Sequence, residues 1–214
     1  MKKLNLYPYL FLSMAFSVLL STCRYYMSGR VTYVFLCWNL MLAFVPFLLS
    51  ELMWRIDFKE KKLLFWILTA FWLLFFPNSP YIMTDLFHLK AKVGAPFWYD
   101  LMLLLSYSFN GFFLGFLSLI SIEKMMSQLY GKIISQILTF IALIACSVGV
   151  YVGRYLRWNS WDVFTKPFSL VQELQDQDFY PIQDSDILKF TLVFSIFLVL
   201  NYFILKKIAS LGDK

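Results

Sequence analysis

The stretch "IISQILTFIALIACSVGVYVGRY", residues 133–155, decides the fold class. It is apolar along almost its whole length and contains no acidic residue. A helix needs roughly 20 apolar residues to cross the hydrocarbon core of a bilayer, and this run is long enough. Polar and charged residues follow at once, in "LRWNSWD" at 156–162. The stretch therefore predicts a transmembrane helix that ends beside a polar segment.

Further runs of the same kind lie along the chain. Of its 214 residues, 60% are hydrophobic and 15% are charged, whereas a typical soluble domain carries about 25% charged residues. We expect an all-α fold, a polytopic transmembrane helix bundle, built as a single integral membrane domain over residues 1–214. The six expected spans lie near residues 6–21, 31–49, 63–76, 97–121, 133–155 and 187–205.

The first run has features of a cleaved leader. "MKKLNLYPYLFLSMAFSVLLSTC" combines a basic start with an apolar stretch, as a signal peptide does. "LSTC" at 20–23 approaches a lipoprotein cleavage site, but Thr22 and Arg24 fit that site poorly. Because the run is close to spanning length, we expect an uncleaved first helix, with cleavage as the alternative.

An even number of spans places both termini on one side of the membrane. More Lys and Arg residues fall on that side, and basic residues favour the cytoplasm. We expect a protein of the bacterial plasma membrane with both termini in the cytoplasm. The segments 22–30, 77–96 and 156–186 would then face outward. The net charge of +6 fits basic cytoplasmic loops, and without a basic stripe we expect no nucleic-acid binding.

The segment "FPNSPYIMTDLFHLKAKVGAP", residues 76–96, follows the third span. Its two prolines stop a helix, so we expect residues 77–96 to re-enter the membrane or to form a short interfacial helix capped by Ser79 or Thr84. Asp85 and His88, the only histidine, are three positions apart and share a helix face. They suggest a metal-ligand pair or a proton relay. The alternative is a capping aspartate beside an interfacial histidine.

Four side chains near the end of the fifth span fall at helical spacing: Arg154, Arg157, Trp158 and Trp161. If the helix continues, they share one face, and the two guanidiniums form a fork for an anion. That anion is a lipid phosphate or a carboxylate such as Asp85 or Asp100. The alternative is that the arginines extend toward the membrane surface and the tryptophans belong to an interfacial aromatic belt.

The remaining polar residues of these segments have simpler structural interpretations. Asn159 and Asp162 have the spacing of a helix capping box. Asn39, inside the second span, is expected to bond another helix, and Asn78 is assigned a structural polar role. In the fifth span, Gly149 and Gly153 have the GxxxG spacing that lets two helices approach closely.

The motifs "PNSPYIMTD", "WYDL" and "GRYLRWNSWD", together with "WNLMLAFVP" in the second span, resemble those of a family of bacterial multi-pass membrane proteins. That family is known only as a domain of unknown function. The resemblance covers residues 30–205, nearly the whole chain. It implies a six-span membrane protein and supplies no activity.

The motifs should converge on the outer side of the bundle. We expect a polar outward-facing site that binds a lipid headgroup, a small anion or a membrane protein partner, with the lipid bilayer as its surroundings. One alternative is an outward-facing membrane enzyme, metal-dependent or acid/base-dependent, acting on lipid-linked or envelope substrates. Its candidate catalytic residues are Asp85, His88, Asp100 and Asp162. Another alternative is a small transporter. The sequence assigns no metal ligand set and no cofactor.

Overall fold

The computed structural model describes residues 6–165 and 184–211, and these residues form helices and connecting turns without a strand. Six helical segments are long and apolar enough to cross a membrane, which confirms the predicted all-α bundle of six spans. The helices are α1 (Tyr7–Ser28), α2 (Phe35–Arg55), α3 (Lys62–Phe75), α4 (Asn78–Tyr81), the 3-10 helix η1 (Ile82–His88), α5 (Phe97–Tyr130), α6 (Lys132–Tyr155), α7 (Asp162–Thr165) and α9 (Asp184–Leu211).

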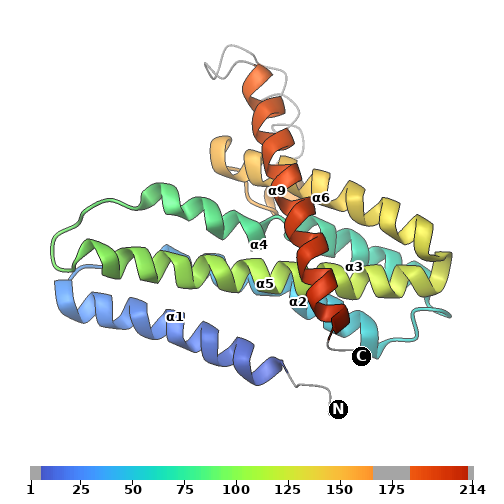
Figure 1. Ribbon diagram of the computed structural model, residues 1–214, viewed down its shortest axis with the longest axis horizontal. Helices are drawn as coiled ribbons and strands as arrows, with labels where there is room; N and C mark the ends of the chain where they lie inside the picture. Colours follow the sequence, from blue (N-terminus) through green and yellow to red (C-terminus); the bar gives the residue numbers. More distant parts are fainter. Residues whose placement is uncertain (1–5, 166–183, 212–214) are drawn as a thin grey trace.

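Helix α5 forms the centre of the bundle (Figure 1). It packs against α1, α2, α4, η1, α6 and α9. In its membrane-crossing part 67% of the residues are buried, against 11% in α9, which lies across the outside of α6. The start of α1 and the end of α9 lie toward the same end of the bundle, called here the terminal end. The connections 29–34 and 89–96 lie at the opposite end, and the segment 156–161 lies beside the end of α3; these three segments together are called here the loop end (Figure 1).

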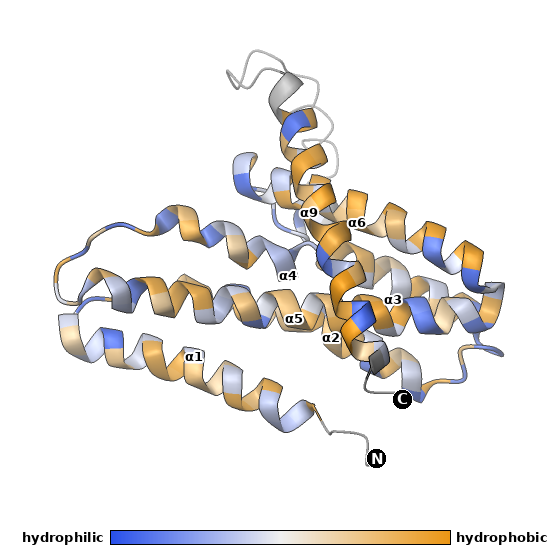
Figure 2. Cartoon of the chain, in the orientation of Figure 1, coloured by the Kyte–Doolittle hydropathy of each residue, from blue (hydrophilic) through white to orange (hydrophobic). Residues whose placement is uncertain are grey.

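Hydrophobic residues predominate along the long helices (Figure 2). Leu12, Leu63 and Ile133 belong to three different helices, and all are largely exposed. Scattered exposed apolar residues are normal on a soluble protein, but continuous apolar faces on long helices suit the hydrocarbon of a bilayer. The exposed surface therefore agrees with a membrane-spanning bundle.

Helix α1 is longer than the sequence predicts. It was expected to end near residue 21, but it continues to Ser28 and ends where Gly29 takes a left-handed φ of 63°. Arg24 was therefore misplaced in the predicted outer segment 22–30. It lies within the helix, on the buried face that packs against α5.

The third span is interrupted rather than ended by its prolines. Helix α3 has 14 residues, which gives a length of about 21 Å, short of the roughly 30 Å hydrocarbon core. The chain continues through α4 and η1, so that the whole span covers Lys62–His88. The predicted loop 77–96 is thus mostly part of a span, and only residues 89–96 connect it to α5. Ser79 and Thr84 are buried there and cap no helix.

Two pairs of glycines with GxxxG spacing hold this interruption: Gly111 and Gly115 on α5, and Gly149 and Gly153 on α6. A β-carbon at Gly111 would lie 2.5 Å from the carbonyl oxygen of Ser79. A β-carbon at Gly149 would lie 2.5 Å from Cγ of Pro77. Only glycine permits such contacts, as expected for the pair on α6. The pair on α5 has the same spacing and was overlooked in the sequence.

Side chains satisfy the carbonyl groups that the interruption leaves without helical partners. Asn78 Nδ2 donates to the carbonyl oxygen of Phe75 at 2.9 Å, and Ser160 Oγ donates to that of Leu74 at 3.0 Å. Asn78 Nδ2 also donates to Ser160 Oγ at 2.9 Å. Unpaired carbonyls are costly in a membrane, so these bonds stabilise the break and tie residues 158–160 to the end of α3.

Candidate functional site

A buried ion pair joins η1 to α6 at the loop-end half of the bundle. Arg154 Nη2 lies 2.5 Å from Asp85 Oδ1, and Asn39 Nδ2 of α2 donates to Asp85 Oδ2 at 2.8 Å. The side chain of Asp85 is 1% exposed and that of Arg154 is 10% exposed. Three segments distant in the sequence thus meet at one carboxylate, and each of its oxygens accepts a hydrogen bond.

Arg154 makes further contacts along η1. Its Nε donates to Thr84 Oγ1 at 2.8 Å, and its Nη1 donates to His88 Nε2 at 3.1 Å. Its guanidinium also lies 4.3 Å from the centroid of the Tyr81 ring. Because a guanidinium only donates, His88 Nε2 must accept, and the ring proton lies on Nδ1. The residues Asn39, Tyr81, Thr84, Asp85, His88 and Arg154 are called here the Arg154 cluster.

The Arg154 cluster keeps its charged groups in mutual contact. Asp85 and His88, paired in the sequence analysis, both contact Arg154 rather than each other. Asp85 is enclosed, whereas His88 is exposed and keeps its Nδ1–H as a donor. Across residues 6–165 and 184–211, no three His, Cys, Asp or Glu side chains group closely enough to hold a metal ion. The contacts described within this cluster are an ion pair, hydrogen bonds and the stacking of Arg154 on Tyr81.

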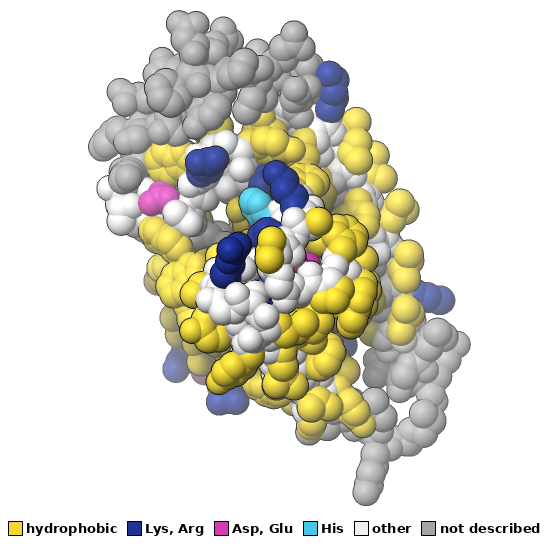
Figure 3. Space-filling model, turned by 90° about the vertical axis from the view of Figure 1, so that its left-hand side faces the viewer, with side chains coloured by type: hydrophobic (Ala, Val, Ile, Leu, Met, Phe, Trp, Pro, Cys, Tyr) yellow, Lys and Arg dark blue, Asp and Glu magenta, His cyan; other side chains and the backbone are white. Residues whose placement is uncertain are grey.

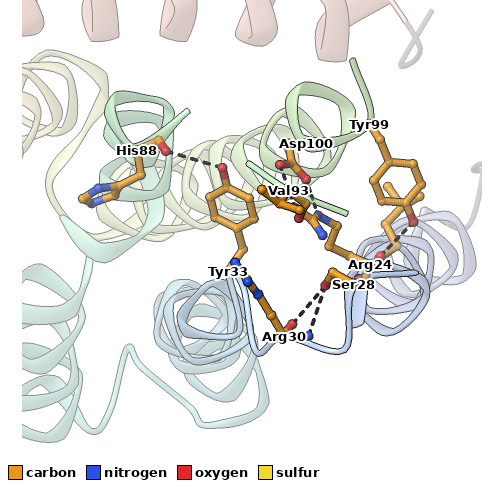
Figure 4. Close-up of polar contacts among 9 residues, drawn as sticks. Arg24, Ser28, Arg30, Tyr33, His88, Val93, Tyr99 and Asp100 are labelled. Carbon is orange, nitrogen blue, oxygen red and sulfur yellow. Dashed lines mark hydrogen bonds and ion pairs between the residues drawn. The ribbon is translucent and has the colours of Figure 1, made fainter. Parts of the chain in front are cut away.

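A second buried ion pair joins α1 to α5 (Figure 4). Arg24 Nε lies 2.6 Å from Asp100 Oδ1, Arg24 Nη2 lies 3.3 Å from Asp100 Oδ2, and both side chains are 0% exposed. Arg24 Nη2 also donates to the carbonyl oxygen of Val93 at 3.4 Å. Asp100, a candidate catalytic residue, is therefore sealed by an arginine that the sequence analysis did not consider, and it does not pair with Arg154 or Arg157.

A sequence signal for Arg24 existed. Ser17, Ser21, Arg24 and Ser28 follow each other at helical spacing and form a polar stripe in an otherwise apolar helix. The first three are buried, and Ser21 bonds the hydroxyl of Tyr107 on α5 at 2.9 Å. A polar stripe on a membrane helix faces protein rather than lipid. Ending the first span at residue 21 concealed this stripe.

Tyr33 connects the two ion pairs. It is buried, and its hydroxyl donates to the carbonyl oxygen of His88 at 3.4 Å. Figure 4 shows its ring between His88 and the Arg24–Asp100 pair. Burial raises the pKa of the Tyr33 phenol, and the negative charge of Asp100 adds to this effect. The neutral phenol thus remains a hydrogen-bond donor in this position.

The predicted guanidinium fork does not form on a helix face. Helix α6 ends at Tyr155, and Arg157 takes a left-handed φ of 59°. The backbone N–H of Trp158 then donates back to the carbonyl oxygen of Val152 at 3.4 Å. Arg154 points into its cluster, whereas Arg157 is exposed. Arg154, Arg157, Trp158 and Trp161 therefore do not share the face that continuation of the helix would have given them.

The segment after this turn has one of the two bonds of the expected capping box, because the N–H of Asp162 donates to the backbone carbonyl oxygen of Asn159 at 3.0 Å and not to its side chain. Asp162 Oδ2 accepts from the backbone N–H of Asn159 at 2.8 Å and from its side-chain Nδ2 at 3.1 Å. Helix α7 starts at Asp162. The ring of Trp161 lies edge-to-face with Trp38 of α2, with 6.3 Å between centroids. Asp162 thus bonds the turn that precedes α7, and Trp161 packs against α2.

A cavity of about 150 Å³ lies between the interrupted span and α6. Pro77, Asn78 and Tyr81 line it on one side and Gly149, Val152 and Gly153 on the other. Residues 158–160 complete its wall. The cavity thus adjoins the Arg154 cluster, because Tyr81 contributes to both.

The loop end carries exposed cations: Arg30, Lys90, Lys92 and Arg157. Figure 3, which looks at this end, shows Lys and Arg side chains around the single histidine. The Lys92 ammonium lies 3.8 Å from the centroid of the Tyr33 ring. Desolvation there lowers the pKa of Lys92, the charge of Asp100 opposes this, and Arg24 and Lys90 lower it further. None of the four cations forms an ion pair within the described residues.

The chain matches a known protein family. The profile of the family described as "Protein of unknown function (DUF1361)" matches residues 38–201, most of the chain. The chain belongs to this family. No curated protein sequence and no solved structure matched this DUF1361 chain. The whole Arg154 cluster lies inside the matched region, and Arg24 lies before it.

This DUF1361 chain has a further polar contact at its terminal end. Helix α5 continues to Tyr130, so Glu123 lies inside it and is buried. Glu123 accepts a hydrogen bond from Tyr202 and pairs with Lys206 at 2.5 Å, both on α9. These contacts attach the otherwise peripheral α9 to the central helix.

Proposed function

We propose that this DUF1361 protein is a multi-pass protein of the bacterial plasma membrane that binds the phosphate of an anionic lipid headgroup at its loop end. One observation carries the proposal. Asp85 and Asp100 are neutralised by Arg154 and Arg24, so they cannot compensate the remaining cations of that end. Those cations are Arg30, Lys90, Lys92 and Arg157. These four cations form no ion pair with a described carboxylate, and exposed cations attract anions.

Arg157 is the best placed of these cations for a lipid phosphate. It stands on the left-handed turn after α6, and Trp158 and Trp161 follow closely in the chain. Indole rings favour the membrane–water interface, which is also the depth of lipid phosphates. A guanidinium can bind such a phosphate through two parallel hydrogen bonds. In this proposal Arg154 is a positioning residue, since its contacts with Asp85, Thr84 and His88 fix the end of α6.

The proposed orientation places the termini in the cytoplasm and the loop end outside. Arg24 and Arg154 lie in helices and pair with buried acids, so they do not add to the loop charges of the outer side. The terminal end keeps its exposed loop residues Lys59 and Lys61. Single cysteines at Lys90 and Lys59, in a chain lacking its native cysteines, test this. An impermeant thiol reagent added to intact cells should label only the Lys90 variant, and the reverse pattern would overturn the orientation.

Lipid retention by the purified protein tests the binding proposal. The protein is placed in phosphatidylcholine nanodiscs containing a minor share of phosphatidylglycerol, and bound lipids are measured by native mass spectrometry after release. The variant Lys90→Gln with Arg157→Gln should retain several-fold less phosphatidylglycerol, and added salt should weaken retention by the native chain. The control Lys59→Gln with Lys61→Gln makes the same charge change at the terminal end. Equal losses in both variants, or no preference for the anionic lipid, would refute the proposal.

A membrane enzyme acting on lipid-linked or envelope substrates is the second candidate, and His88 is the observation that favours it. The imidazole is exposed, and Arg154 occupies Nε2, which leaves the Nδ1–H for a substrate. The variant His88→Gln tests this role by complementation of a deletion strain. Loss of function at a normal protein level would support catalysis. Full complementation would exclude it, because glutamine cannot transfer protons as imidazole does.

A further inference from the structure

The cavity beside the interrupted span is too small to hold a whole lipid molecule. Its volume is about 150 Å³. A pair of acyl chains cannot enter such a space, whereas a glycerol unit or a sugar ring fits it. The cavity therefore selects for a small group rather than for a whole lipid.

The polar side chains on the described wall of the cavity are uncharged. Asn78 uses both hydrogens of its amide, for Phe75 and Ser160, so its Oδ1 is left as an acceptor. Tyr81 has a hydroxyl that bonds no other described residue. Asn159 donates through Nδ2 to Asp162, and its own Oδ1 is likewise left as an acceptor. Amide oxygens and a phenol hydroxyl are suitable partners for the hydroxyl groups of a ligand.

The rest of the wall is apolar and partly aromatic. Trp158, Val152 and the two glycines of α6 line the space together with Leu74, Pro77 and the aromatic Tyr81. Few polar groups on a largely apolar wall are typical of small-molecule sites. An aromatic ring also packs well against the C–H face of a polyol. Among the described lining residues none carries a charge, so an ionised phosphate would find no charged partner on this part of the wall.

The nearest available cation along the chain stands at the edge of this wall. Arg157 directly precedes Trp158 and is exposed. A ligand with a neutral hydroxylated part and a phosphate would use both features, the first inside the cavity and the second at Arg157. We infer that the cavity holds the polyol of a polyol phosphate, a glycerol or sugar unit, whose phosphate lies at Arg157. This inference rests on the proposed function and specifies its headgroup.

A comparison of two anionic lipids shows whether the protein recognises the polyol of the headgroup or only its phosphate. Phosphatidylglycerol carries both groups, and phosphatidate with the same acyl chains carries only the phosphate. In phosphatidylcholine nanodiscs the native chain should retain phosphatidylglycerol several-fold over phosphatidate. Val152→Trp fills the cavity and should abolish this preference without reducing phosphatidate retention. Val148→Trp, one turn earlier on the exposed face of α6, is the control and should keep the preference.

A less disruptive substitution provides a second test if the Val152→Trp variant does not fold. Tyr81→Phe removes the hydroxyl alone and leaves the ring against Arg154 and Gly153. It should also reduce the preference for phosphatidylglycerol. Glycerol 1-phosphate added in solution identifies the source of the ligand. Competition at micromolar concentration would indicate a free polyol phosphate, and failure to compete at millimolar concentration would indicate the lipid.

The outcomes for the inference and for the proposed function are separate. Equal retention of phosphatidylglycerol and phosphatidate by the native chain overturns the inference, and the cavity then holds only water. The proposed function survives that result, because both lipids carry the phosphate. Retention of neither lipid above phosphatidylcholine refutes the proposed function as well. A preference that persists in both Val152→Trp and Tyr81→Phe overturns the inference alone.

Discussion

The two buried arginine–carboxylate pairs of this protein use the same chemistry in different surroundings. Arg24 and Asp100 are both 0% exposed, and one guanidinium nitrogen, Nη1, has no partner among the described residues. Arg154 is 10% exposed and divides its hydrogen bonds among Asp85, Thr84 and the exposed His88. A sealed pair can only hold helices together. A pair that reaches the surface can also position groups that meet a ligand.

The difference predicts unequal responses to mutation. Transfer of a charge into a bundle costs solvation energy, and the partner must compensate it. The Arg24–Asp100 pair is called here the sealed pair. If one partner is removed from it, the other keeps a buried charge, and almost no other group can stabilise that charge. The Arg154–Asp85 pair is called here the open pair. If one partner is removed from it, the remaining charged group keeps other hydrogen-bond partners and some contact with solvent. The sealed pair should therefore matter more for stability, and the open pair more for the site.

The largest expected effect is on the sealed pair. Asp100→Asn should lower the free energy of unfolding by about 3–5 kcal/mol, because Arg24 remains charged and buried. Thermal unfolding in detergent measures this. The double variant Arg24→Met with Asp100→Leu removes both charges and should recover most of the loss. A double variant as unstable as the single one would show that the pair contributes more than mutual neutralisation.

Asp85→Asn should have a smaller effect on stability. Arg154 loses a charged partner but keeps Thr84, His88 and the Tyr81 ring, so we expect a loss of about 1.5–3 kcal/mol. The same unfolding measurement compares it with Asp100→Asn. An equal or larger loss in Asp85→Asn would contradict the contrast between the two pairs.

Two glycines extend the comparison to backbone packing. A β-carbon at Gly94 would lie 2.6 Å from Ser28 Cβ, and its φ of 95° disfavours other residues. A β-carbon at Gly153 would lie 3.3 Å from the Tyr81 ring, a tight but tolerable distance. Gly94→Ala, beside the sealed pair, should cost about 1–3 kcal/mol, and Gly153→Ala, beside the open one, less than about 1 kcal/mol. Unfolding midpoints in detergent should rank the two variants in this order, and the opposite ranking would show that the open site is the more tightly packed.

The smallest expected effect is that of His88→Gln. The side chain is exposed, and a glutamine carbonyl can still accept from Arg154, so stability should change by less than about 0.5 kcal/mol. Unfolding in detergent provides the measurement. A loss comparable to that of Asp85→Asn would mean that His88 is a structural member of the Arg154 cluster.

The apolar runs were sufficient to predict the six spans. The length of a span depends on the thickness of the bilayer, so each span can be recognised from its own stretch of sequence. The boundaries were less predictable where polar residues lie inside the membrane. Arg24 was taken as a sign that α1 had ended, and Pro77 as a sign that the third span had ended. In both places other helices supply the missing partners: Asp100 on α5, and the glycine pairs that enclose the break. These partners are distant in the sequence.

The candidate residues were predicted better than their pairings. The sequence placed Asp85, His88 and Arg154 on the same side, and the structure joins them in one cluster. It did not predict which carboxylate each arginine binds, because that depends on helix rotation. The fork with Arg157 failed for a local reason, since the helix ends at Tyr155 in a left-handed turn without a glycine or proline.

A structure determined in nanodiscs with retained native lipid tests the central claim most directly. The account predicts phosphate density beside Arg157, headgroup density in the cavity near Tyr81, and an Arg154–Asp85 pair as short as the 2.5 Å found here. A lipid phosphate bound by Arg154, with Asp85 displaced, would contradict the division between positioning and binding residues. An ordered loop end without any lipid or anion at Arg157 would contradict the proposed function itself.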